Sequence, residues 1–275
     1  MNKIDRNAPV GVFDSGVGGL TVAREIMRQI PQEKIVYFGD TARVPYGNKS
    51  KDTIVRYSRQ IIRFLKSQGV KAIVIACNTA SAYALDVVKE ELDIPIIGVI
   101  NAGARTAVSA TRNGRIGVIG TMGTIGSGIY TEVIQQMRPD VRVIGKACPL
   151  FVPLVQEGLI HDSVTDEIAS RYLAELKGKY IDTLVLGCTH YPLLRSTLGR
   201  LMGDDVTLVN PAYETAIELK ELLTAHYLDR ENELEPGEEQ YQFFVSDLAE
   251  QFTEFATSIL PNQVHGTRKI NIEEF

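Results

Sequence analysis

The fold is decided by the segment VGVFDSGVGG at residues 10–19. This segment begins as an apolar run and ends in a polar, glycine-rich turn. Leu20, Ala23, Met27 and Ile30 follow it at helical spacing, which predicts a short buried strand, a tight turn and a helix. A strand that leads directly into a helix in this way is typical of the first part of a βαβ unit.

The same alternation of strand and helix patterns continues along the chain. Short apolar runs at Ile35–Phe38, Ala72–Ala76 and Ile96–Val99 predict further strands. Apolar residues at helical spacing lie between them, over Ile54–Leu65 and Ala80–Leu92. Strands separated by helices of this length predict a parallel sheet and therefore an α/β fold.

The strand pattern is repeated later in the sequence. Val10–Phe13 resembles Ile116–Ile119 at an offset of about 106 residues, and Gly39 and Gly145, each expected after a strand, keep that offset. Chance likeness among glycine-rich turns is the alternative explanation. The common order of the matching strands favours an internal duplication.

The third strand of each copy ends at a cysteine. Ala72–Ala76 precedes Cys77, and Thr183–Gly187 precedes Cys188 at an offset of about 111 residues, so a few inserted residues explain the drift. In open α/β sheets, ligands bind beyond the carboxyl ends of the strands. The two thiols are therefore expected at equivalent places in two half-sites.

These patterns predict an α/β fold with two pseudo-symmetric parallel-sheet domains. The first domain is expected at residues 1–98 and the second at residues 99–210. A tail at residues 211–275 follows the second domain.

The tail itself has a loop followed by two regular elements. Asp229–Gln240 is acidic and contains Pro236-Gly237, which predicts a surface loop. Phe243–Val245 predicts a strand, and Leu248–Ile259 has the pattern of a helix.

Composition limits the classes of function. The chain has 275 residues, 44% of them hydrophobic, and a net charge of −5. No stripe of Lys and Arg indicates a nucleic-acid partner. The N-terminal residues do not resemble a signal peptide, and polar residues interrupt the most apolar stretch, Ala72–Val88, so a membrane span is not expected.

Cysteine and histidine usage favours a reducing environment and no metal. The three cysteines are an odd number, which argues against a disulfide framework and predicts a cytoplasmic location. No cysteine pair has CxxC spacing and the four histidines are scattered, so a metal site is not expected.

The chemistry of Cys77 and Cys188 follows from their predicted positions. A helix N-terminus offers free amide donors and a partial positive charge, which can lower a thiol pKa or hold a carboxylate. The alternative is that each cysteine is a small, inert, buried side chain. Two cysteines at repeat-equivalent positions favour the functional interpretation. Cys148 aligns with Ala42 in the repeat instead, and is interpreted as structural.

Other motifs are weak when taken singly. The turn after Asp14 could be a phosphate loop, but it has neither GxGxxG spacing nor a Walker lysine. Asp14 could be only a helix cap, and Tyr46-Gly47 only a turn. His190, two residues after Cys188, could be a hydrogen-bond partner of the thiol or purely structural.

Together these motifs resemble those of the glutamate racemase family, part of the aspartate/glutamate racemase superfamily. The resemblance covers nearly the whole chain and is most specific at the two cysteine motifs. The matching segments are VFDSGVGGLT at residues 12–21, Gly39-Asp40-Thr41, Pro45-Tyr46-Gly47, Ala76-Cys77-Asn78-Thr79-Ala80, and Gly187-Cys188-Thr189-His190-Tyr191-Pro192.

The resemblance implies that the active site lies between the two domains and that the tail at residues 211–275 completes the first domain. It also implies a cofactor-independent racemase that interconverts L- and D-glutamate through two cysteine thiols, with Asp14 and His190 as helpers of Cys77 and Cys188. By resemblance, Cys77 takes the proton from D-glutamate and Cys188 from L-glutamate. Asp40 matches an acidic position that is implicated less directly, and so does Glu157. The implied substrate-binding residues are Asp14, Ser15, Tyr46, Gly47, Asn78, Thr79, Thr121, Thr189 and His190.

The family also implies a biological setting. Its product, D-glutamate, supplies bacterial peptidoglycan synthesis, and a homodimer is the family-level expectation. Two other classes remain open from the residues alone. A thiol-dependent hydrolase or lyase would need one nucleophilic cysteine, and an amino-acid receptor would bind its ligand without exchanging the Cα proton. Pyridoxal chemistry would need a Schiff-base lysine, to which no motif points.

Overall fold

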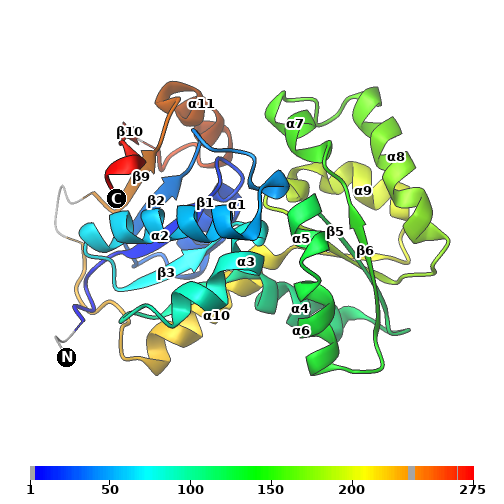
Figure 1. The fold of residues 1–275 in the computed structure, drawn as a ribbon, viewed down its shortest axis with the longest axis horizontal. Helices are drawn as coiled ribbons and strands as arrows, with labels where there is room; N and C mark the ends of the chain where they lie inside the picture. Colours follow the sequence, from blue (N-terminus) through cyan, green and yellow to red (C-terminus); the bar gives the residue numbers. More distant parts are fainter. Residues whose placement is uncertain (1–3, 235–238, 265) are drawn as a thin grey trace.

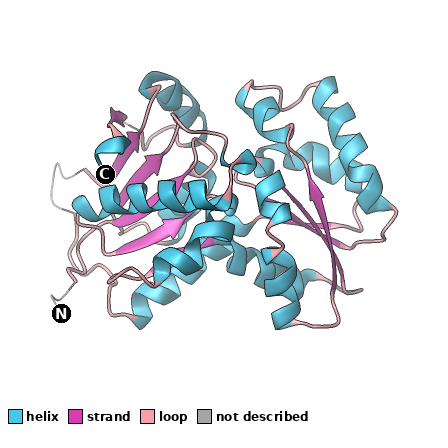
Figure 2. Ribbon diagram, in the orientation of Figure 1, coloured by secondary structure: helices cyan, strands magenta, loops and turns pink. Residues whose placement is uncertain are grey.

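The computed structural model describes residues 4–234, 239–264 and 266–275. It has two parallel sheets that lie side by side, each covered by helices (Figures 1 and 2). This arrangement confirms the predicted α/β fold with two parallel-sheet domains. Pro236-Gly237, part of the predicted acidic loop, lies outside the described residues.

The first sheet has the strand order β10-β9-β2-β1-β3-β4, and all its pairs are parallel. Two strands from the end of the chain therefore extend a sheet that begins at residue 10. The strands and helices of this part are β1 (Val10–Asp14), α1 (Leu20–Gln29), β2 (Ile35–Gly39), η1 (Tyr46–Asn48), α2 (Lys51–Ser67), β3 (Ala72–Ile75), α3 (Asn78–Lys89), β4 (Ile96–Gly98), α10 (Pro211–Ala225), β9 (Tyr241–Val245), α11 (Ala249–Ile259), β10 (Arg268–Lys269) and η3 (Ile272–Glu274).

The second sheet has the order β6-β5-β7-β8, also all parallel. This order matches β2-β1-β3-β4 of the first sheet, as an internal duplication predicts. Its elements are α4 (Val99–Ala110), β5 (Arg115–Gly120), α5 (Met122–Gly126), α6 (Ile129–Met137), β6 (Arg142–Ala147), α7 (Phe151–Gln156), α8 (Ser163–Lys177), β7 (Thr183–Gly187), η2 (Tyr191–Leu194), α9 (Arg195–Met202) and β8 (Thr207–Val209).

One detail of the predicted repeat is wrong. Gly39 is the last residue of β2, but Gly145 lies inside β6, which continues to Ala147. The paired strand explains the difference, because β5 also runs on and pairs Gly120 with Ala147. A glycine alone does not end a strand whose neighbour still offers hydrogen-bond partners.

Each sheet buries apolar side chains on both faces. The first sheet packs against α1, α10 and α11 on one face and against α2 and α3 on the other. The second packs against α7, α8 and α9 on one face and against α4 and α6 on the other. Burial on both faces is expected for parallel strands, which read as continuous apolar runs. We propose domain limits of 1–98 with 211–275 for the first domain and 99–210 for the second. The reason is that α10 packs on the first core and α4 mainly on the second.

A buried ion pair ties the tail to the start of the chain. Lys71 and Glu33 are 0% and 1% exposed, and Nζ lies 2.6 Å from Oε2. Lys71 Nζ also donates to the Arg6 carbonyl, and Glu33 Oε1 accepts the Arg230 amide at 3.0 Å. Removing one partner of such a pair would leave an uncompensated buried charge, at a cost of about 3–5 kcal/mol. In the described part of the chain, no helix is long and apolar enough to cross a membrane.

Candidate active site

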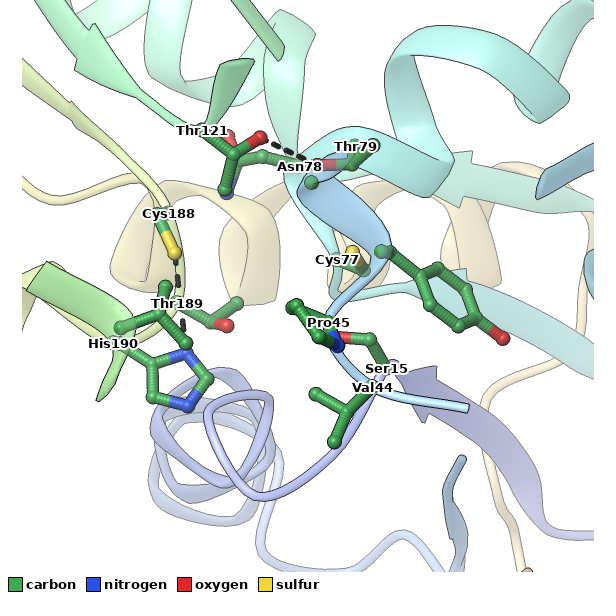
Figure 3. A pocket seen from close by; sticks show the side chains of 13 residues that line it. Ser15, Val44, Pro45, Cys77, Asn78, Thr79, Thr121, Cys188, Thr189 and His190 are labelled. Carbon is green, nitrogen blue, oxygen red and sulfur yellow. Dashed lines mark hydrogen bonds between the residues drawn. The ribbon is translucent and has the colours of Figure 1, made fainter. Parts of the chain in front are cut away.

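The carboxyl ends of both sheets border one small pocket (Figure 3). Its cavity volume is about 20 Å³, room for about one water molecule, so the two halves are closed on the site. The pocket lining brings together ten of the residues expected at the site. The lining residues are Ser15, Val44, Pro45, Tyr46, Gly47, Cys77, Asn78, Thr79, Thr121, Val152, Cys188, Thr189 and His190.

Cys77 occupies the N-cap position of α3, two residues after the end of β3. Burial, together with the neighbouring charge of Asp14, raises the pKa of its thiol to about 12. Hydrogen bonds from the Ala80 and Thr79 amides and from the Ser15 hydroxyl act in the opposite direction. The helix N-terminus therefore favours the thiolate, as the sequence predicts, but burial outweighs it while the pocket is closed.

Cys188 lies across the pocket from Cys77 (Figure 3). The expected α-helix does not follow it directly: the 3-10 helix η2 comes first, and α9 begins only at Arg195. Pro192 explains this difference, because a proline restricts the preceding residue and donates no hydrogen bond. Burial raises the pKa of the Cys188 thiol, Cys77 and Asp14 raise it further, and the amides of His190 and Tyr191 oppose them.

Asp14 is fully buried behind the pocket and is not among its lining residues. Its Oδ2 accepts the Gly16 and Gly19 amides at 3.1 and 3.0 Å, and its Oδ1 accepts the Thr189 hydroxyl at 3.4 Å. Burial raises its pKa to about 6 despite these hydrogen bonds. The glycine turn makes the packing possible, because a Cβ at Gly19 would lie 2.4 Å from Asp14 Cβ.

His190 lies beside the second thiol, with Nδ1 3.9 Å from Cys188 Sγ. The ring is buried, which lowers its pKa to about 4. The imidazole is therefore neutral at neutral pH. Gly18 approaches it closely, since a Cβ there would lie 2.6 Å from His190 Nδ1. The glycines after Asp14 thus let the turn contact both Asp14 and His190, which gives a structural reason for the glycine-rich motif.

Hydroxyl groups from the two halves meet on one side of the pocket. Thr79 Oγ1 lies 2.8 Å from Thr121 Oγ1 and 3.1 Å from Thr124 Oγ1. Figure 3 shows the first of these contacts, which joins the start of α3 to the turn after β5. Gly47 also packs across the interface, because a Cβ there would lie 2.5 Å from Thr121 Cβ.

Asp40 supports the pocket from behind. It is fully buried and accepts hydrogen bonds from the Tyr46 hydroxyl, from Arg43 Nε, and from the Ser246 hydroxyl at 2.8 Å. It therefore orients the Tyr46 loop and does not line the pocket. Glu157 is exposed and borders a neighbouring cavity of about 270 Å³ next to α11.

Five residues at or next to the pocket are missing from the sequence prediction. Val44, Pro45 and Val152 line it, and Thr124 and Tyr130 hydrogen-bond to residues that do. Pro45 lies beside the predicted Tyr46-Gly47 turn and was within reach of the motif. The others are ordinary apolar or polar residues in sequence, and only the folded chain brings them to the site.

The third thiol is separate from the site. Cys148 is buried next to Phe151 and Tyr191, and its carbonyl accepts the Tyr191 hydroxyl at 2.8 Å. Over residues 4–234, 239–264 and 266–275, no cluster of three His, Cys, Asp or Glu side chains is placed to hold a metal ion.

The pocket offers two opposed thiols, polar donors and no lysine or arginine among its lining residues. Its acid–base groups are a carboxyl with a pKa of about 6 and a neutral imidazole. Perturbed titratable groups in a buried cleft are characteristic of active sites. Such a site is suited to moving a proton between two faces of a small polar molecule.

The comparisons with known proteins agree with this chemistry. The sequence profile of the Asp/Glu/Hydantoin racemase family matches residues 12–217, and the chain belongs to that family.

The most informative relatives are glutamate racemases. That of Geobacter metallireducens is 47% identical over 266 residues, covering 96% of this chain and 97% of the relative. That of Chlorobaculum tepidum is 48% identical, covering 92% and 93%. The chain is thus an enzyme, an isomerase of the glutamate racemase type.

Solved structures give the same result. A glutamate racemase isoform of Bacillus anthracis superimposes with a TM-score of 0.91 at 40% identity, covering 96% of this chain and 98% of that one. The Francisella tularensis glutamate racemase, solved in complex with D-glutamate, gives 0.90 at 36% identity, covering 98% and 100%.

Proposed function

We propose that this enzyme racemises glutamate without a cofactor, with Cys77 and Cys188 acting on opposite faces of Cα. One thiol is ionised and removes the proton, and the other delivers a proton to the opposite face. The observation that carries the proposal is the position of two thiols across one closed pocket, each at the end of an equivalent strand. By family resemblance, Cys77 deprotonates D-glutamate and Cys188 deprotonates L-glutamate.

The substrate itself supplies the charge that the pocket lacks. Both thiols are protonated in the closed site, because burial raises the pKa of each. No cationic side chain lines the pocket, so the ammonium group of glutamate would be the nearest positive charge. A positive charge within a few ångströms favours the thiolate, so one thiol would release its proton to solvent as the substrate binds and before the site closes. Ionised Asp14 favours an ammonium ion in the same way, and His190 can exchange a proton with Cys188.

The transition state needs stabilisation that acid–base groups alone do not give. The Cα proton beside an ionised carboxylate is weakly acidic, and a positioned acid or base contributes about 10²–10⁴-fold. The donors available for the developing charge are the backbone amides after each cysteine and the side chains of Asn78 and Thr189. We propose that Ser15 and the Tyr46-Gly47 loop hold the γ-carboxylate.

Entrance of glutamate requires the two halves to separate. The closed cavity of about 20 Å³ is much smaller than the substrate. Closure around the bound substrate would then expel water and strengthen each polar contact. The proposal also includes the family's biological role, which is supply of D-glutamate for peptidoglycan in the cytoplasm, and a homodimer as the assembly.

Isotope exchange tests the two-thiol mechanism. A thiol carries a single proton, so return of the abstracted proton is silent, whereas inversion delivers a proton that has equilibrated with solvent. In D₂O, starting from unlabelled L-glutamate, the first D-glutamate should carry deuterium at Cα while the remaining L-glutamate stays mostly protiated. The same asymmetry is expected from D-glutamate. Mass spectra of the separated enantiomers at low conversion measure it.

A single base serving both faces would give a different pattern. It would carry part of the original proton into the product. Abundant protiated product at low conversion would therefore contradict the assignment of Cys77 and Cys188 to opposite faces, even if both residues proved essential.

A further inference from the structure

Tyr130 makes a buried contact between the two halves of the site. It belongs to α6, which packs on the second sheet, and its hydroxyl lies 2.7 Å from Oδ1 of Asn78 at the start of α3. The two side chains are 3% and 4% exposed. Tyr130 does not line the pocket, whereas Asn78 does.

Two glycines leave space for the ring of Tyr130. A Cβ at Gly187, directly before Cys188, would lie 3.3 Å from Tyr130 Cε2. A Cβ at Gly103 on α4 would lie 3.2 Å from the Tyr130 hydroxyl oxygen. Side chains at either position would crowd the ring, so the glycines allow it to approach Asn78. Burial and the nearby Cys188 raise the pKa of Tyr130, so its hydroxyl remains protonated and can donate.

The hydrogen bond determines what Asn78 presents to the pocket. An asparagine amide has one acceptor oxygen and two N–H donors. Because Oδ1 accepts the hydrogen bond from Tyr130, both N–H donors of Nδ2 stay available. Nδ2 makes no hydrogen bond to any of the described residues. The opposite rotamer would present the oxygen to the cavity and repel a carboxylate.

We propose that Tyr130 is a positioning residue that turns the Asn78 amide N–H donors toward the α-carboxylate of the substrate. This inference rests on the proposed function, in which Asn78 stabilises charge at that carboxylate. Because the hydrogen bond joins α6 to α3, it forms only when the halves are together. Closure of the enzyme and correct orientation of the amide therefore occur as one event.

A double-mutant cycle tests this role. Tyr130→Phe removes only the hydroxyl. We expect kcat to fall about tenfold in both directions and KM to change less than about threefold. The effect is moderate because the Asn78 amide donor is misdirected and not removed. Asn78→Ala removes the donor, with an expected fall in kcat of about 10²-fold. In the Asn78→Ala background, Tyr130→Phe should have no further effect, since its only route is through the missing amide.

Tyr83→Phe provides the matched control. Tyr83 belongs to α3, as Asn78 does, and is partly buried. Its hydroxyl makes no hydrogen bond to the described part of the chain. We expect its kinetics to match those of the wild type.

The possible outcomes separate the inference from the proposed function. Additive losses in the double mutant, or unchanged kcat in Tyr130→Phe, would overturn the positioning role. If Asn78→Ala itself kept full activity, the role of Asn78 in the proposed function would fail as well. The isotope experiment in D₂O would remain an independent test of the two thiols.

Discussion

The two halves of the pocket have the same strand order but differ in the group beside each thiol. β1 ends at Asp14, whereas the equivalent position at the end of β5 is Gly120. Conversely, Cys188 is followed two residues later by His190, whereas the residue two after Cys77 is Thr79. The first half therefore contributes a carboxyl group and the second an imidazole.

The shared strand order accounts for the positions of the two thiols but not for the groups beside them. Two equivalent strand ends are enough to place thiols on opposite sides of one pocket. The groups beside the two thiols, Asp14 and His190, are chemically different. Their environments set different pKa values, about 6 for Asp14 and about 4 for His190. An enzyme that must act on two mirror-image substrates thus does so with chemically different half-sites.

The largest effect should come from removing either thiol. Cys77→Ala and Cys188→Ala should each abolish racemisation in both directions, a loss of more than about 10³-fold, because inversion needs a group on each face. Optical rotation of L- or D-glutamate solutions measures it. Cys148→Ala is the matched control and should keep most of the activity, since Cys148 lies outside the pocket. Near-normal turnover in either pocket variant would contradict the two-thiol mechanism, because one thiol would then be sufficient for inversion.

The next prediction distinguishes Asp14 from His190 by the pH dependence of kcat/KM. Asp14 ionises as the pH rises through about 6, so kcat/KM of the wild type should decline below that pH. Asp14→Asn should lower kcat/KM about 10²-fold and remove this acidic limb.

His190→Asn is the contrasting variant. Because burial lowers the pKa of His190 to about 4, this variant should lose activity yet keep the acidic limb near pH 6. Loss of that limb in His190→Asn, and its survival in Asp14→Asn, would reverse the assignment of the titrating group.

A smaller effect is expected where the glycine turn contacts the second half. A Cβ at Gly18 would lie 2.3 Å from Thr189 Oγ1 and 2.6 Å from His190 Nδ1. Gly18→Ala should therefore displace these side chains and lower kcat by about 10–100-fold, since small misplacements of catalytic groups are costly. Gly126→Ala is the control, because a Cβ there would have no neighbour within 4 Å. Equal activity of the two variants would show that the turn does not position the second half-site.

The sequence predicted the parts of this site that depend on local pattern. Apolar runs that end at Asp14, Cys77 and Cys188 place these residues at strand ends, because buried parallel strands are continuous apolar segments. The delayed α-helix after Cys188 is also a local effect, because Pro192 restricts the residue before it and donates no backbone hydrogen bond.

Other features depend on contacts between distant residues. Tyr130 meets Asn78, and Ser246 meets Asp40 across 206 positions of the chain. No periodicity or motif in the sequence records such a contact. The raised pKa of Asp14 likewise follows from complete burial, which a helix-capping pattern cannot reveal.

The smallest expected effect concerns stability at Asp14. Its folded-state pKa, about 6, is above the ordinary value of 3.8. Between those values the folded state holds the proton more tightly than the unfolded state, so this contribution to stability is present below about pH 4 and is lost as the pH rises through about 6. Burying the ionised carboxylate therefore costs up to about 3 kcal/mol at neutral pH, from a shift of about two pKa units.

Asp14→Asn should consequently make the protein more stable at pH 7, by about 1–3 kcal/mol, even as it loses activity. The amide can replace the carboxylate without new strain: one oxygen, Oδ2, accepts both the Gly16 and Gly19 amides, and the other faces the Thr189 hydroxyl, to which an amide N–H can donate. Urea unfolding of variant and wild type at pH 7 and pH 4.5 measures the difference, which should shrink at the lower pH as the wild-type carboxyl becomes protonated. A difference that is the same at both pH values would mean that Asp14 is not the group that titrates. The second half-site has Gly120 at the equivalent place and carries no such cost. The proposed catalytic role of Asp14 would therefore come at the expense of stability.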